Sequence, residues 1–537
     1  MSIAQSVAHI LRERVTLEVE SIDRLYLNVY VPKLQRIGGV VGFFREMRGA
    51  TFASSALMEP LTTAFVKALE RFAQTEDVPL LTFPHGQRKD EVAQEYLAAF
   101  STQEGVFFIG KAQEKATVWR TERRYNAQTG QPYAWLVKST ALVNQYYIYA
   151  VDRDFGPFFL KFCSYFPYNA KLCLNGHEYL KRHLTKEGIA FEALDNGLLS
   201  CADPARMQEI CDGLDAPTID ALLRKWLARV PHPFTPEERE AGFRYDVSIL
   251  QAEFALTQVL DRPVTGRILC EEIIRENLDV GRPDQVQLIF GRRVTKQTTA
   301  RYRFRTRVIT QGVIPSLYAD DKHSRIKQYH KEGRALRTET TINDTRDFAI
   351  GKRLHNLPAL RAVGFQANRR LLDVQHLSHD CLLGEDVFRQ VTRPQVVGDQ
   401  RVAALPFADP RVQALLSVLV LSCLRPNGFA RKDVRAHLAP LLGLDPSHLT
   451  PGRLTYDLRR LRLHGLIARI PHTQRHRVTR EGLRTALFFT RVYGRILRPG
   501  LARLVPVAPP GDMALQPYFD QVEGAIDRWI DHAKLAA

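Results

Sequence analysis

The region from Asp409 to Leu497 constrains the fold of this 537-residue chain more than any other stretch. It opens with an apolar helical run, and a second helical run follows a Pro-Asn-Gly turn. Thr450 and Pro451 are typical of a helix N-cap and of the first position inside a helix, and the leucines that follow at helical spacing end at Gly465. Two short extended runs and a last helical run complete the region. The sequence therefore predicts the order helix, helix, helix, hairpin, helix.

This order resembles that of winged-helix DNA-binding domains, with the stretch HGLIARIPHTQRHRVTREGLR as the end of the third helix, the wing and the exit. The resemblance implies that the third helix enters the major groove of DNA and that the wing lies nearer the backbone or the minor groove. The side chains that would contact nucleic acid are Arg453, Arg459, Arg460 and Arg462 on the helix and Arg475, His476 and Arg477 on the wing.

The charge of this region supports a polyanionic partner. Residues 411–500 hold 17 Lys and Arg against four Asp and Glu, a net charge of +13, and the whole chain carries +17. A phosphate backbone is the partner that such a basic module most often meets, and the charge fits DNA and RNA equally well. The alternative is a winged helix that makes only protein contacts.

The pattern of the remaining chain predicts a mixed α/β, multidomain fold. Strands and helices alternate near the N-terminus, whereas later segments favour antiparallel hairpins. The predicted parts are a small α/β domain at 1–120, a central α+β domain with a basic hairpin at 121–400, the winged helix at 409–497, and a Pro-rich linker with a terminal helix at 498–537.

Apolar runs and cysteines bear on the location of the protein. No apolar run reaches the length of a membrane span, and the N-terminus lacks the basic and apolar pattern of a signal peptide. The seven cysteines include no CxxC pair. We therefore expect a cytoplasmic protein with reduced thiols and no membrane partner.

A central hairpin is predicted between residues 323 and 344, with strands at 324–330 and 334–343 and a three-residue loop that ends in Gly. A loop of odd length keeps the odd-numbered side chains of both strands on one face. Arg325, Lys327 and Tyr329 would then share a face with Arg337 and Glu339.

The Lys-x-Tyr-x-Lys and Arg-x-Glu patterns of this hairpin resemble part of the nicking domain of some rolling-circle replication initiators. The resemblance implies that Tyr329 attacks phosphate, that Glu339 binds a divalent metal such as Mg2+ or Mn2+, and that Lys327 and Arg337 stabilise the charge on phosphate. Two alternatives are open. The hairpin could contact phosphate without chemistry, or Glu339 could simply neutralise the neighbouring arginine.

Two further groups of residues are candidates. Asp152 and Asp154 end a strand in an order similar to the opening of RNase H-like nucleases, in which a first-strand Asp helps bind metal; an Asp-x-Asp turn is the structural alternative. Four arginines that alternate along one predicted strand would share a phosphate-facing surface, and with Arg325 they extend the predicted nucleic-acid contacts: Arg301, Arg303, Arg305 and Arg307.

Most of the chain before residue 380 resembles a widespread bacterial family of uncharacterised proteins, through segments such as IGKAQE, LNGHE and IKQYHK. The resemblance implies a bacterial protein and no particular activity. Phosphate-loop, GxSxG and HExxH motifs are absent, which disfavours ATPases, serine hydrolases and zinc proteases. Two functions are therefore expected. One is nucleic-acid binding with metal-dependent nicking, as in mobile elements; the other is a non-enzymatic, sequence-specific regulator or guide-RNA-binding partner.

Overall fold

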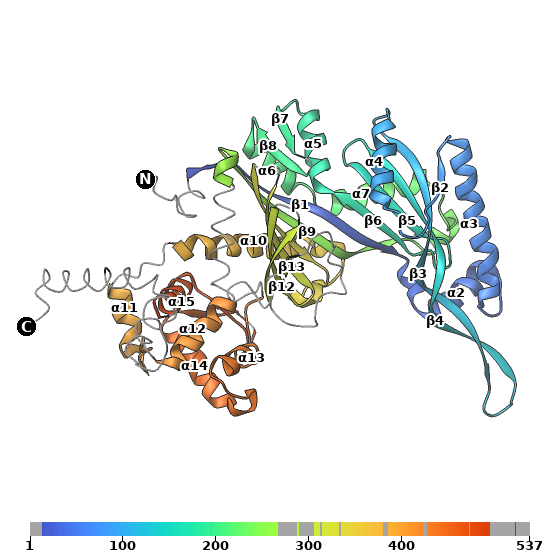
Figure 1. Cartoon of the computed structure of the whole chain (residues 1–537). Coiled ribbons are helices and arrows are strands. Elements are labelled where there is room, and N and C mark those ends of the chain that lie inside the picture. The colour runs from blue at the N-terminus through green and yellow to red at the C-terminus, as the bar shows by residue number, and fades with distance from the viewer. Residues whose placement is uncertain are drawn as a thin grey trace, which may run out of the picture. The chain divides into compact units, whose positions relative to one another are not determined.

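The protein is described by a computed structural model in which the chain divides into two compact units, Met1–Asp373 and Val374–Ala537 (Figure 1). The predicted mixed α/β class is confirmed, because helices pack on a large mixed sheet in the first unit. The described residues are 13–194, 196–266, 287–288, 305–311, 314–331, 334–379, 385–407, 409–422, 427–471, 473–493 and 521.

The described residues of the first unit form a 12-stranded sheet with the order β10-β11-β12-β13-β14-β9-β1-β6-β5-β4-β3-β2. Neighbouring strands are antiparallel, except that β10 and β2 each run parallel to their neighbour. The strands are β1 (Val15–Tyr30), β2 (Leu80–Thr82), β3 (Gly105–Tyr125), β4 (Pro132–Asp152), β5 (Gly156–Cys163), β6 (Ala170–Asn175), β9 (Asp246–Leu260), β10 (Gln287–Leu288), β11 (Arg305–Gln311), β12 (Ile314–Asp321), β13 (Ser324–Lys331) and β14 (Ala335–Ile342). A separate hairpin joins β7 (Phe191–Leu194) to β8 (Gly197–Cys201).

The helices of the first unit cover this sheet. A large apolar core includes side chains from α2, α3, α5, α6 and α7, and in it the rings of Trp226 and Phe158 lie 5.0 Å apart. A second apolar cluster packs α4 against β3 and β4. Among the described residues the helices are α2 (Ile37–Arg48), α3 (Ser55–Thr75), α4 (Lys89–Ala99), α5 (Gly176–Lys186), α6 (Pro204–Asp212), α7 (Ala216–Arg229), α8 (Pro236–Glu240) and α10 (Leu357–His379), with 3-10 turns η1 (Pro32–Gln35), η3 (Thr345–Phe348) and η4 (Leu354–Asn356).

The predicted domain boundary at residue 120 falls inside β3. Strands from both predicted segments, 1–120 and 121–400, pair in the same sheet, and one core joins them. A separate N-terminal α/β domain is therefore not formed. The first unit instead ends at Asp373, within α10.

The second unit holds the predicted order of three helices, a hairpin and a fourth helix. Thr450 caps α14 by accepting a hydrogen bond from the backbone N–H of Arg453, and Thr479 caps α15 in the same way. The elements are α11 (Glu385–Thr392), β15 (Gln395–Val397), β16 (Gln400–Val402), α12 (Pro410–Ser422), α13 (Arg431–Leu441), η5 (Pro446–His448), α14 (Pro451–Leu463), β17 (Ile467–Arg469), β18 (His476–Val478) and α15 (Arg480–Val492). The predicted linker and terminal helix at 498–537 lie outside the described residues, apart from residue 521.

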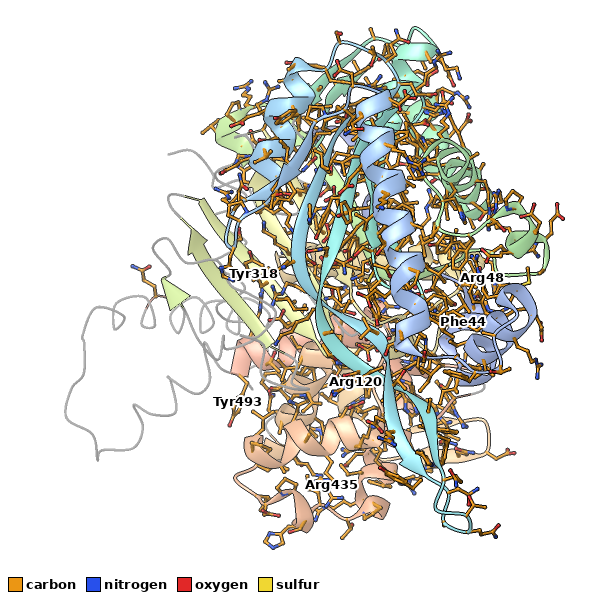
Figure 2. All side chains as sticks on the ribbon, turned by 90° about the vertical axis from the view of Figure 1, so that its right-hand side faces the viewer. Phe44, Arg48, Arg120, Tyr318, Arg435 and Tyr493 are labelled. Atoms are coloured by element: carbon orange, nitrogen blue, oxygen red, sulfur yellow. The ribbon has the colours of Figure 1, made fainter. Side chains whose placement is uncertain are left out.

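The hairpin of β3 and β4 is the longest in the first unit, with 21 residues in each strand. The strands stay paired from Gly105 and Val151 to Tyr125 and Pro132. Figures 1 and 2 show that the distal part of this ribbon projects away from the rest of the first unit, with Arg120 close to where it leaves the sheet. We name this distal part, residues 120–137, the β3–β4 arm.

Candidate functional site

The predicted register of the central hairpin is confirmed. In the pairing of β13 with β14, Lys327 lies opposite Glu339 and Tyr329 lies opposite Arg337. The loop residues Glu332 and Gly333 lie outside the described residues. The four side chains of the predicted nicking site are therefore neighbours, as the odd-numbered face requires.

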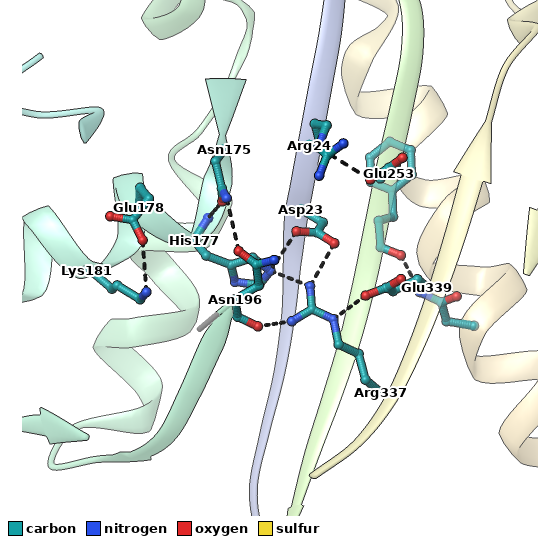
Figure 3. A network of polar contacts seen from close by, with 12 residues as sticks. Asp23, Arg24, Asn175, His177, Glu178, Lys181, Asn196, Glu253, Arg337 and Glu339 are labelled. Carbon is teal, nitrogen blue, oxygen red and sulfur yellow. Dashed lines mark hydrogen bonds and ion pairs between the residues drawn. The ribbon is translucent and has the colours of Figure 1, made fainter. Parts of the chain in front are cut away.

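Arg337 is fully buried, with 0% of its side chain exposed. Figure 3 shows the polar groups around its guanidinium. Its Nη2 lies 2.8 Å from Asp23 Oδ2 and 2.8 Å from His177 Nε2. Its Nη1 donates to the backbone oxygen of Asn196, and its Nε lies 2.5 Å from Glu339 Oε1. Every guanidinium nitrogen thus points at a protein group, and this placement does not favour the predicted role of Arg337 in stabilising phosphate.

Local structure brings these distant residues to Arg337. The register of β1 against β9 shifts between Ile22 and Arg24, so that Asp23 has no partner residue on β9; such a bulge re-aims a side chain. Asn175 caps α5 by accepting a hydrogen bond of 2.8 Å from the backbone N–H of His177. The cap places His177 in the first turn of the helix, and the imidazole is 1% exposed.

The charges of this network are balanced inside the protein. Burial alone would raise the pKa of Asp23, but the contact with His177 and the charge of Arg337 hold that pKa well below its usual range. Burial lowers the pKa of His177, which favours the neutral imidazole, and its Nε2 lies 2.8 Å from Arg337 Nη2 and 3.2 Å from Asp23 Oδ1. The guanidinium thus lies between two carboxylates, Asp23 and Glu339.

Tyr329 is held in its protonated form. Its hydroxyl donates to Glu339 Oε1 at 2.7 Å, and Lys327 Nζ lies 4.0 Å from the centre of its ring. Burial, followed by the charge of Glu339, raises the pKa of Tyr329 far above its ordinary value. A nucleophile needs the opposite shift. The arrangement therefore matches the alternative in which Glu339 neutralises its arginine neighbour.

Glu253 on β9 lies near the charges of the Arg337 network, and its pKa is raised. That pKa is raised to about 7, first by burial and also by the nearby charges of Asp23 and Glu339, while Arg24, whose Nε lies 3.9 Å from Glu253 Oε2, opposes the shift. A carboxyl group with a raised folded pKa adds stability that is complete below its unfolded pKa of 4.5 and is lost as the pH rises towards 7.

Replacing Glu253 with Gln should therefore stabilise the first unit, and only at higher pH. We expect no advantage near pH 4, a gain that grows through the window from about 4.5 to about 7, and a plateau of roughly 2–3 kcal/mol above it. Urea unfolding across this pH range measures the difference. Glu95→Gln, at an exposed position on α4, is the matched control. A gain that does not depend on pH would contradict the interpretation.

Asp152 and Asp154, the two predicted metal ligands at the end of β4 and in the turn that follows, make contacts within the protein. Asp152 accepts from the backbone N–H groups of Asp154 and Phe155, and its other oxygen accepts from Lys225 Nζ at 2.7 Å and Trp226 Nε1 at 2.8 Å. Asp154 pairs with Lys186 at 3.2 Å. Among the described residues no three His, Cys, Asp or Glu side chains come together as a metal site. The contacts of Asp152 and Asp154 thus match the structural alternative, an Asp-x-Asp turn. Within the described residues these two carboxylates and Glu339 do not form a common metal site.

The basic strand is described only in part. Arg301 and Arg303 lie outside the described residues, whereas Arg305 and Arg307 belong to β11, opposite Asp320 and Tyr318 of β12. Arg325 Nε lies 2.6 Å from the buried carboxylate of Asp320. Arg325 therefore has an acidic partner within the protein rather than a free phosphate-facing charge.

The predicted contact residues of the second unit fall into two groups. Arg453, Arg462 and Arg477 are exposed, and within the described residues no ion pair joins them to an acidic side chain. The side chains of the other group make contacts within the second unit. On α14, Arg459 donates to Gln400 Oε1 at 3.1 Å and Arg460 donates to the backbone oxygen of Ala403 at 3.2 Å. On the wing, Arg475 donates to the backbone oxygens of Asn427 and Gly428, each at 2.7 Å. His476 is half-buried, and burial lowers its pKa.

The exposed cations lie on one side of a helix and its wing. Leu454, Asp457, Leu458 and Leu461 form the buried side of α14. By helical spacing, the other half of the helix carries Arg453, Tyr456, Arg459 and Arg462, of which Arg459 is half-buried; we name this set the α14 face. Tyr456, near the centre of this face, is 48% exposed. Arg477 adds an exposed charge from β18.

The four acidic side chains between residues 411 and 500 make other contacts, and no ion pair joins them to Arg453, Arg462 or Arg477 within the described residues. Asp457 is buried with its Oδ2 2.5 Å from Arg411 Nη2. Asp433 accepts from the backbone N–H of Ala430. Asp445 accepts from Ser447, and Glu481 lies 3.6 Å from Arg484. The module therefore keeps an accessible positive surface.

Comparisons with protein-family models, curated proteins and solved structures found no match to this chain. Among the described residues, no helix combines the length and the apolar character that crossing a bilayer requires. Sequence reasoning missed Asp23, His177, Asn196 and Glu253 as members of this network. The one local signal was the Asn175-Gly176 pair before His177, which is typical of a helix start.

Proposed function

We propose that this protein binds nucleic acid through its second unit, with the α14 face and Arg477 against the phosphate backbone. The observation that carries the proposal is the set of exposed arginines on one helix and its hairpin, together with the other contacts that the four acidic side chains of residues 411–500 make. A cytoplasmic bacterial location, expected from the sequence, belongs to the same proposal.

The shape of this module suits a duplex. A 13-residue helix such as α14 fits the major groove, which is about 12 Å wide. Its cap at Thr450 and its buried leucines hold the helix on the unit, so the exposed side is available for contact. Tyr456 would reach a base edge or sugar, while Arg453, Arg462 and Arg477 would meet phosphates. Binding of this kind favours a duplex ligand and a steep dependence on salt.

Strand cleavage, the other function expected from the sequence, has less support than binding alone. Arg337 is buried and its donors are engaged, and burial keeps Tyr329 protonated. The polar network around Arg337 fits a structural role that joins β1, β14 and α5. We therefore propose a non-enzymatic binder as the function and treat nicking as an outcome to be tested.

Binding and cleavage are measured together with full-length protein and labelled duplex DNA, duplex RNA and nicking substrates, with Mg2+, Mn2+ or EDTA. We expect a duplex complex at low salt that weakens steeply as salt rises, and intact strands under every condition. Absence of binding at low salt would contradict the proposal. So would metal-dependent cleavage that Glu339→Gln abolishes, because it would return catalysis to the central hairpin.

A further inference from the structure

The β3–β4 arm is anchored at its base. The indole Nε1 of Trp119 donates to the backbone oxygen of Leu34 at 3.1 Å, and Leu136, opposite Thr121, is 2% exposed. These two side chains belong to the main apolar core of the first unit. Beyond them, from Glu122 to Val137 through the turn, every described side chain except those of Leu136 and Val137 is exposed. The base is therefore fixed and the distal part is accessible.

One face of the arm combines cations and aromatic rings. Pairing places Arg120, Glu122 and Arg124 opposite Val137, Trp135 and Tyr133, so these side chains share a face. Trp135 is 38% exposed and Tyr133 44%. Their rings lie 6.3 Å apart at 88°, and Arg124 Cζ is 5.2 Å from the centre of the Trp135 ring.

These rings add little to the apolar core. Neither Trp135 nor Tyr133 belongs to the main core or to the α4 cluster, whereas the anchors Trp119 and Leu136 do. Exposed aromatic side chains on a projecting ribbon usually mark a contact surface. The charge of the arm indicates the kind of partner. Residues 115–138 hold five Lys and Arg against one Glu, and that Glu122 lies 3.4 Å from Arg124.

We propose that this face of the β3–β4 arm binds single-stranded nucleic acid. Unpaired bases stack on the rings of Trp135 and Tyr133, and Arg120 and Arg124 contact the phosphates. Cationic groups beside exposed rings are the combination that binds single strands without reading their sequence. A duplex keeps its bases stacked on one another, so it offers little to these rings. The arm is a surface separate from the α14 face, and it adds a second class of ligand to the proposed function.

The test uses full-length protein and a short labelled thymidine oligonucleotide. We expect Trp135→Ala to weaken binding by about tenfold and the pair Tyr133→Ala with Trp135→Ala by about a hundredfold, while Trp135→Phe keeps most of the affinity. Arg120→Ala with Arg124→Ala should reduce the dependence of binding on salt. Phe52→Ala and Arg45→Ala, at exposed positions of the same unit, are the matched controls.

Tryptophan fluorescence gives an independent measurement. Of the four tryptophans, Trp119 and Trp226 are buried, Trp135 is exposed, and Trp529 lies outside the described residues. Oligonucleotide binding should therefore quench the emission, and Trp135→Phe should remove most of that quenching. Unchanged affinity and quenching in the arm variants would overturn the proposal. Arm variants that no longer bind a protein partner of the wild type but still bind the oligonucleotide with full affinity would also overturn it.

Cross-testing separates this proposal from the proposed function. Arm variants should keep duplex binding, and variants of the α14 face should keep binding of the thymidine oligonucleotide. Duplex binding alone, unaffected by the arm, would overturn only the inference about the arm. Arm-dependent single-strand binding with no duplex complex would overturn only the proposal for the second unit.

Discussion

Replacing Arg337 with Ala should lower the free energy of unfolding of the first unit by about 3–5 kcal/mol. The guanidinium is fully buried between Asp23 and Glu339, and its removal leaves two carboxylates in a desolvated place without their cation. The backbone oxygen of Asn196 also loses a donor. Urea unfolding at neutral pH, followed by tryptophan fluorescence, measures the loss, since Trp119 and Trp226 of the first unit are buried.

Two variants make this experiment specific. Lys327→Ala, on the neighbouring strand, removes a half-exposed cation and should cost no more than about 1 kcal/mol. Arg337→Met combined with Asp23→Asn and Glu339→Gln removes all three charges together and should recover much of the stability. A loss below about 1 kcal/mol for Arg337→Ala would mean that the network does not hold β1, β14 and α5 together.

Replacing Arg453, Arg462 and Arg477 together with Ala should weaken duplex binding by about a hundredfold at moderate salt. All three guanidiniums are exposed and none has an acidic partner among the described residues, so their loss removes phosphate contacts and leaves the packing intact. Fluorescence anisotropy with a labelled duplex measures the change. The thermal transition of the variant should match that of the wild type.

A charge-matched variant is the control. Arg45, Arg71 and Arg88 are exposed in the first unit, and their joint replacement with Ala removes the same charge. It should leave duplex affinity within about threefold of the wild type. Equal losses in the two variants would mean that net charge, rather than the α14 face, drives binding.

Much of the second unit could be predicted because its signals are local. Thr450 before Pro451 marks a cap, and leucines at helical spacing mark the buried side of α14. The register of the central hairpin followed from the length of its loop. These features depend on residues a few positions apart, and the sequence displays such spacings directly.

Burial and long-range pairing could not be predicted. Arg337 was expected on an open face, but its partners Asp23, His177 and Asn196 come from segments far away in the chain. The boundary at residue 120 was misplaced because the sequence does not show that β3 continues into a sheet shared with β1.

The arginines of the second unit show the same limit. Arg475 and Arg477 lie two residues apart on the wing, yet Arg475 donates to Asn427 and Gly428 while Arg477 is exposed. Sequence patterns identify a basic element. They do not show which of its cations the protein itself uses, because that depends on contacts from other elements.

The salt dependence of duplex binding by full-length protein tests the central claim most directly. Each phosphate that a cation neutralises adds about 0.9 to the slope of log affinity against log salt. The slope of the Arg453→Ala, Arg462→Ala, Arg477→Ala variant should therefore be smaller than that of the wild type by about 2.7. An identical slope in the two proteins would contradict the assignment of these arginines to phosphate contacts.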